Sequence, residues 1–194
     1  MTTGPISPRR ADTRRSHERI LAAAGASLAE SGEISFNAIA KRAHVGVGTV
    51  YRHFPSPEAL VLAVYEFEVR QLVEVVPTLL QAHSPHEAFK VWVADHLAHY
   101  TVTKRGLAGA LRAAAAGREM HNRAFEDMST AVSTLIKANV EAGTVRPDLD
   151  PRTVLTGLSG LLLLDSNGDR QAQTASLIDL LWRGMRADNC TDNA

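Results

Sequence analysis

Apolar residues recur along this chain with the period of an α-helix in nearly every segment. In residues 13–31, for example, Ile20, Ala24 and Leu28 share one face, and Gly32 follows as a suitable helix end. The alternation of apolar and polar residues that marks a strand is scarce. The sequence therefore predicts an all-α fold of roughly nine helices, divided into a three-helix N-terminal head and a larger C-terminal helical domain.

Residues 35–54 predict two short helices joined by a tight turn. Ser35 is a favourable N-cap for the first helix, and the small Ala40 lets the second helix approach closely. Val50 and Phe54 lie four residues apart, so they form the inner face of the second helix. A glycine-containing turn between two short helices is the sequence form of a helix-turn-helix, whose second helix enters the major groove of DNA.

The remaining side chains of the second helix are left to face the groove and the DNA backbone. The positive end of the first helix, at Ser35, is also suited to hold a phosphate. With two arginines from the N-terminal region, the predicted DNA-binding residues are Arg14, Arg15, Ser35, Val47, Gly48, Thr49, Tyr51, Arg52 and His53.

This stretch closely resembles the DNA-binding head of the TetR family of bacterial transcriptional regulators. The family signature is an IA pair, a turn with a glycine and then GT-x-Y-x-x-F, which corresponds here to Ile39, Ala40, Val45, Gly46, Gly48, Thr49, Tyr51 and Phe54. The resemblance is specific across residues 15–62 and architectural beyond them. It implies a homodimer that binds a two-fold operator in double-stranded DNA and a second domain that binds a small-molecule effector.

Two residues depart from the family pattern. The family usually has Ser or Thr where Gly46 stands, and Lys where Pro57 stands. Glycine offers no hydroxyl to a phosphate, and proline carries no charge. Two customary phosphate contacts are therefore missing, which places more weight on the N-terminal arm, residues 1–12.

Charge is unevenly distributed although the formal net charge is +0. Residues 1–60 hold eight Lys or Arg and five Asp or Glu, a net +3, and the remainder carries −3. A basic arm in front of a helix-turn-helix neutralises phosphates and releases counterions.

Cysteine usage and hydropathy bear on the compartment. Cys190 is the single cysteine, so no disulfide can form within the chain. The N-terminus lacks an apolar signal region, and Leu161–Leu164 is too short to span a bilayer. The sequence predicts a soluble cytoplasmic protein with no membrane partner.

The later helices are expected where capping residues and apolar periodicity coincide. They are predicted at 57–76, 85–103, 106–117, 119–142, 151–165 and 171–187, with a turn at 166–168. The predicted domains are a DNA-binding domain at 1–56, an effector-binding and dimerisation domain at 57–187, and a tail at 188–194.

The family plan places an effector pocket among the helices of residues 85–142. The residues expected to line it are Trp92, His96, Tyr100, Leu111, Met120, Phe125 and Met128. Each of them taken singly is as well explained by core packing. A pocket of this composition favours a small, largely apolar effector.

The last two helices are rich in leucine, which covers nearly every face of the segment 151–165. Simple core packing would also account for both helices. We interpret them as half of a four-helix dimer interface, because a two-fold operator needs two heads. The residues expected in the interface are Leu155, Leu158, Leu162, Leu177 and Leu181.

The sequence gives little support for metal binding or for catalysis. His96 and His99 have a spacing that can ligate a metal, but no matching ligand set stands elsewhere, so neither a metal nor a cofactor is predicted. There is no nucleophile elbow or phosphate-binding glycine loop, and no catalytic residue is assigned. The principal prediction is a ligand-released repressor. Two alternatives remain, a DNA-binding regulator without an effector and a helical enzyme or small-molecule-binding protein with a vestigial head.

Overall fold

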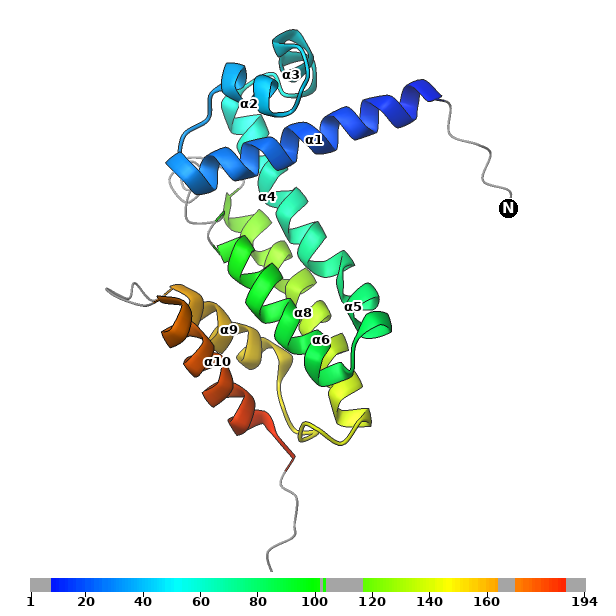
Figure 1. Cartoon of the computed structure of the whole chain (residues 1–194), viewed down its shortest axis with the longest axis vertical. Coiled ribbons are helices and arrows are strands. Elements are labelled where there is room, and N and C mark those ends of the chain that lie inside the picture. The colour runs from blue at the N-terminus through cyan, green and yellow to red at the C-terminus, as the bar shows by residue number, and fades with distance from the viewer. Residues whose placement is uncertain (1–7, 102, 104–116, 164–169, 188–194) are drawn as a thin grey trace, which may run out of the picture. The chain divides into compact units, whose positions relative to one another are not determined.

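The computed structural model describes residues 8–101, 103, 117–163 and 170–187. Within these ranges the chain is helical, and the only β-pairing is an isolated bridge between Val145 and Arg186. The elements are α1 (Pro8–Ser31), α2 (Phe36–Arg42), α3 (Val47–His53), α4 (Pro57–Glu74), α5 (Val76–Ala82), α6 (Pro85–Val91), the π-helix η1 (Trp92–Leu97), α8 (Gly117–Glu141), α9 (Pro151–Leu163) and α10 (Arg170–Met185) (Figure 1). The predicted all-α class is confirmed.

The chain forms two compact units that divide within α4. Unit 1 comprises residues 1–68 and 102–118, and unit 2 comprises residues 69–101 and 119–194. The division therefore lies beyond the boundary expected at residue 56. The physical reason is that Leu60 and Val64, in the first half of α4, are completely buried and belong to the core of unit 1.

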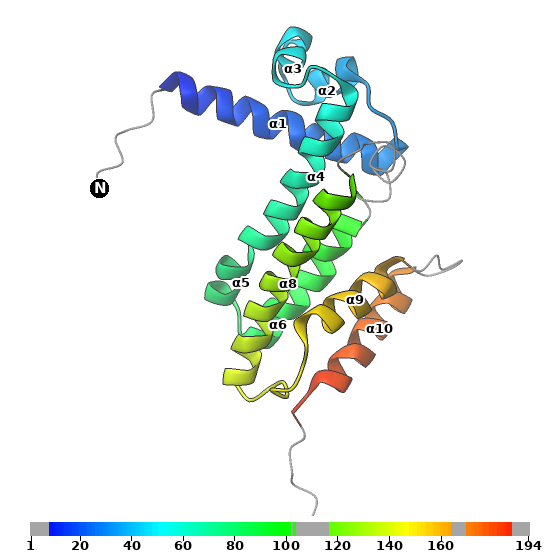
Figure 2. The ribbon, with the colours of Figure 1, turned by 180° about the vertical axis from the view of Figure 1, so that it is seen from behind.

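Each unit is built on helix pairing. In unit 1, α2 packs on both α1 and α3, with Ile39 and Val50 fully buried. In unit 2, α9 and α10 run side by side, as both views show (Figures 1 and 2), and α6 continues directly into η1.

Helix starts were predicted well because capping is a local interaction. Four capping side chains each accept a hydrogen bond from the backbone N–H three residues further on: Ser35, Ser56, Ser84 and Asp150. Hydrogen bonds from Thr153 lower the pKa of Asp150, because they stabilise its charged form.

Three predicted boundaries were wrong. α1 begins at Pro8, so residues 8–12 of the proposed arm are helical. Residues 77–82, for which no helix was predicted, belong to helix α5, in which Pro77 occupies the first turn, where its missing N–H costs nothing. The helix expected without interruption over 85–103 contains the π-helix η1. Of the helix predicted at 106–117, only Gly117 is described, and it is the first residue of α8. The turn predicted at 166–168 and the tail at 188–194 lie outside the described residues.

The buried polar residue Asn139 ties three parts of unit 2 together. Its Nδ2 donates to the carbonyl oxygen of Pro85 at 2.9 Å and to that of Leu135 at 2.8 Å. The hydroxyl of Thr144 donates to the Asn139 side chain at 2.8 Å. Asn139 is completely buried, so these bonds join α8 to the start of α6 and to the turn after α8.

Replacing Asn139 with leucine should lower the free energy of unfolding by about 1–3 kcal/mol, because buried carbonyl and hydroxyl groups lose their partner. Urea unfolding followed by circular dichroism measures this change. The matched control is Thr134→Val, which removes only an exposed hydroxyl bonded to Thr130 in its own helix. Equal stabilities for the two variants would contradict the assigned role of Asn139.

No helix in the described part of the chain is long and apolar enough to cross a bilayer.

Candidate nucleic-acid interface and regulatory domain

The turn between α2 and α3 is held by backbone hydrogen bonds. The N–H of Val45 donates to the carbonyl oxygen of Ala40 at 3.0 Å. In this turn His44 has a φ of 53°, in the left-handed region that residues other than glycine seldom adopt. Gly46 caps α3 without a side-chain hydrogen bond, as expected from its missing hydroxyl. The turn thus holds α3 against α2 without a phosphate-binding side chain at the cap.

One face of α3 is buried in the head and the other is exposed. Val50 and Phe54 are buried, as predicted. Tyr51 has 58% of its surface exposed and Val47 has 41%, which is unusual for large apolar side chains. Gly48 and Arg52 are also exposed, whereas Thr49 and His53 are half-buried. The short helix α3 therefore presents a mixed apolar and polar surface of the kind that reads base edges.

Contacts within the head orient the exposed side chains. The ring of Tyr51 packs against Phe36, with 4.8 Å between centroids. Arg52 donates through Nε to the carbonyl oxygen of Gly48 at 3.1 Å and through Nη2 to the hydroxyl of Thr49 at 3.2 Å. The predicted reading residues are thus held by each other and by α2.

His53 lies beside α1, and its ring is 5.3 Å from that of His17. His17 also stacks on Phe54, with 4.9 Å between centroids. His53 therefore sits at the edge of the exposed face of α3 and links it to α1.

The two arginines predicted from the N-terminal region are exposed on α1. Arg15 pairs with Asp12 at 2.5 Å, and Arg14 lies 3.7 Å from Glu18. Exposed pairs of this kind contribute little to stability, so both guanidinium groups can exchange an acid for a phosphate at little cost.

The ion pair between Arg42 and Glu30 joins α2 to α1. Arg42 donates from both terminal nitrogens to the two carboxylate oxygens, at 2.5 and 2.8 Å. These hydrogen bonds lower the pKa of Glu30 and raise that of Arg42. The bidentate geometry adds a directional contact between α1 and α2 at the surface of the head.

Three of the seven predicted effector-lining residues are core residues of unit 2. Trp92, Tyr100 and Met128 are buried, while His96 and Phe125 are half-buried. Leu111 lies outside the described residues. Met120 lies in α8, but its side chain is not among those described. Core packing therefore accounts for three of the predicted residues without a ligand.

Trp92 has a structural role that its sequence position did not reveal. Its Nε1–H donates to the carbonyl oxygen of Leu72 at 2.8 Å. This carbonyl lies in the last turn of α4, just before α5 begins at Val76. Trp92 is completely buried, so η1 is joined to the end of α4 by a hydrogen bond shielded from water.

Two of the predicted dimer-interface residues were wrong. Leu155 and Leu158 are 0% exposed within a single chain, so they belong to the core of unit 2 and have no surface for a partner. Leu162 lies in α9, but its side chain is outside the described set. Leu177 and Leu181 are half-buried and stay candidates.

An apolar surface on α9 and α10 takes their place. Leu180 is 67% exposed, the largest exposed fraction among the large apolar side chains of the described residues. It borders a groove of about 410 Å³ whose lining includes Leu149, Val154, Leu177 and Leu181. We call Leu180 together with these four lining residues the Leu180 surface. Its helical spacing with Leu177 and Leu181 was the available sequence signal.

His96 and His99, whose spacing could ligate a metal although none was predicted, lie at the end of η1 and just after it. His96 is half-buried and His99 is exposed on the following turn. Among the described residues, no three His, Cys, Asp or Glu side chains gather as a metal site would require.

Two models of known protein families match this chain. The model of bacterial regulatory proteins of the tetR family matches residues 20–64. The model of the SbtR-like transcriptional regulator C-terminal domain matches residues 84–187.

Solved and curated relatives agree with these matches. The chain is 35% identical to a TetR transcriptional regulator from Streptomyces coelicolor, over 88% of this chain and 98% of that one, with a TM-score of 0.79. A TetR regulatory protein from Mycobacterium vanbaalenii is 32% identical over 93% and 100% of the two chains, with a TM-score of 0.76. The HTH-type transcriptional regulatory protein RaaS of Mycobacterium tuberculosis is 28% identical over 76% of this chain and 70% of that protein.

Proposed function

Because this chain belongs to the TetR family of bacterial transcriptional regulators, we propose that it is a repressor released from its operator by a small, largely apolar effector. The observation that supports DNA binding is the exposed face of α3. Tyr51 and Val47 are exposed on this face, beside Thr49. A helix that is packed on the head along one face and exposed to solvent along the other can enter the major groove of DNA.

Two heads are needed for a two-fold operator, so we propose a homodimer formed through the Leu180 surface. An exposed leucine beside an apolar groove is costly in water and gains free energy when a second copy covers it. We expect the protein in the cytoplasm, where its operator lies, and we assign it no catalytic residue.

The effector is proposed to act within unit 2 on the segment that holds the end of α4. Trp92 supports this proposal, because its hydrogen bond to Leu72 joins η1 to the end of α4 and so couples a shift of η1 to α4. An effector shifts the protein toward the released state only if it binds that state more tightly. Gel shifts on the upstream DNA of its own gene, with and without compound pools, test this directly. A complex that forms but never dissociates with any pool favours a regulator without an effector, and no complex at all favours a vestigial head.

Arg9 and Arg10, near the N-terminus, should contribute affinity for DNA that does not depend on the base sequence. Since α1 begins at Pro8, substitution is a cleaner change than deletion. Arg9→Gln with Arg10→Gln should reduce the slope of log K against log salt by up to ~0.9 for each phosphate that is no longer neutralised. Fluorescence anisotropy across a salt series measures the slope. Lys137→Gln, which removes an exposed cation of α8, is the control. Identical slopes for all three proteins would show that these arginines do not touch DNA.

A further inference from the structure

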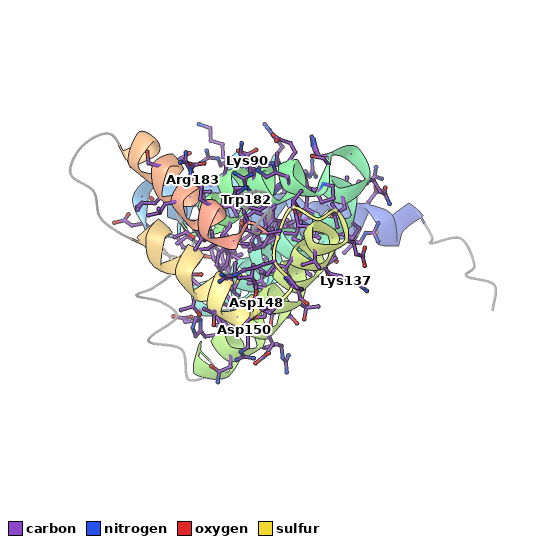
Figure 3. The ribbon with its side chains drawn as sticks, turned by 90° about the horizontal axis from the view of Figure 1, so that it is seen from below. Lys90, Lys137, Asp148, Asp150, Trp182 and Arg183 are labelled. Atoms are coloured by element: carbon purple, nitrogen blue, oxygen red, sulfur yellow. The ribbon has the colours of Figure 1, made fainter. Side chains whose placement is uncertain are left out.

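Unit 2 contains a second groove, formed by α6, η1, α10 and the turn after α8, which we call the α10 groove. Its volume is about 940 Å³, within the range of small-molecule sites. Its lining includes Lys90, Ala94, Ile178, Trp182, Arg183 and Arg186. None of the residues predicted to line an effector pocket belongs to this lining. Figure 3 shows Lys90, Trp182 and Arg183 together on one side of the unit, away from Asp148 and Asp150.

The apolar wall of the groove is preformed. The ring of Trp182 stacks on His86 with 4.2 Å between centroids and an angle of 13°, and it packs against Phe89 at 5.2 Å. These contacts fix the indole, so a ligand does not have to order it. Ile178 and Ala94 extend the apolar wall beside it.

The rim of the groove is positively charged. Lys90 and Arg186 are exposed, and neither has an ion-pair partner within the described ranges. Arg183 is held by Asp179 through Nε at 2.8 Å, which leaves its terminal nitrogens available. Asp179 is the one acidic residue in the described lining, against three cations. The charge balance therefore suits an anion.

The α10 groove and the Leu180 surface use opposite sides of α10. Ile178 and Trp182 are spaced by four residues and form one stripe of α10, and Arg186 directly follows the helix. Leu180 lies two residues from Ile178 and from Trp182, which places it on the other side of the helix. A second copy of the chain on the Leu180 surface would leave the α10 groove open.

We propose that the α10 groove binds an organic anion with an apolar body. The body lies against Trp182 and Ile178, and the anionic group lies among Lys90, Arg183 and Arg186. This site goes beyond the proposed function, because it uses none of the residues predicted to line the effector pocket and its occupation does not require DNA.

Isothermal titration of the full-length protein with three probes tests the proposal. Naphthalene-2-carboxylate carries both features, naphthalene-2-carboxamide lacks the charge, and inorganic phosphate lacks the apolar body. The carboxylate should bind about tenfold more tightly than either of the others, since charge-assisted bonds and apolar contact both contribute. Equal affinity for the carboxamide would contradict the anionic part of the proposal, and equal affinity for phosphate would contradict the apolar part.

Matched variants locate the site. Lys90→Gln with Arg186→Gln should weaken carboxylate binding about tenfold and leave carboxamide binding unchanged. Lys137→Gln, a cation outside the groove (Figure 3), should change neither. The chain has two tryptophans, so its NMR spectrum has two indole N–H signals. The Trp182 signal should shift with the carboxylate and the Trp92 signal should not. Loss of affinity in the Lys137 variant alone, or a shift of Trp92 alone, would overturn the assignment.

Discussion

Replacing Thr49 and Tyr51 with alanine should reduce operator affinity by about 100-fold or more while leaving the fold intact, because removing a side chain that touches a base or the DNA backbone costs about 1–3 kcal/mol. The exposed face of α3 gives the reason. Tyr51 is largely exposed and Thr49 is half-buried, so neither supports the core as Val50 does. Fluorescence anisotropy measures the affinity, and urea unfolding measures the stability.

Two controls distinguish the loss of DNA contacts from the loss of packing within the head. Tyr51→Phe keeps the ring contact with Phe36 and removes only the hydroxyl, so it isolates hydrogen bonding to DNA. Thr130→Ala removes an exposed hydroxyl of α8 and should leave affinity unchanged. If the double variant protects the same operator at full affinity, α3 does not read DNA through this face.

The second large effect concerns the dimer. Leu180→Glu should yield folded monomers, because a carboxylate buried at an apolar interface without a partner costs several kcal/mol. The side chain is 67% exposed in the single chain, so the monomer itself tolerates the charge. Analytical ultracentrifugation at micromolar concentration measures the change.

Leu158→Glu is the matched comparison and should behave differently. Leu158 is completely buried in the core of unit 2, so a carboxylate there should prevent folding, with loss of the helical circular dichroism signal. A folded monomer from Leu158→Glu together with an unaffected dimer from Leu180→Glu would place the interface on α9 core residues after all.

Features that depend on neighbouring residues could be predicted from the sequence. The capping residues Ser35, Ser56, Ser84 and Asp150 act over three positions, so their helix starts were predicted correctly. The inner face of α3 followed from the spacing of Val50 and Phe54. The exposed face of α3, which we propose reads DNA, is the complement of that inner face, so its exposed residues followed from the same spacing.

Features that depend on tertiary contacts could not be predicted. α9 has leucine on nearly every face, and only the packing of unit 2 decides that Leu155 and Leu158 face inward. The carbonyl of Leu72 and the indole of Trp92 are 20 residues apart, and no pattern marks that bond. Pro77 was interpreted as the end of a helix, yet proline fits the first turn of a new helix equally well.

The central claim is that this protein reads a two-fold DNA site through α3. Selection of binding sequences from a random double-stranded library, followed by sequencing, tests it most directly. We expect the parent protein to enrich a palindromic motif, with half-sites related by the two-fold axis of a dimer, and the Thr49→Ala, Tyr51→Ala variant to enrich none. No enriched motif for the parent protein, or the same motif for both proteins, would contradict the account.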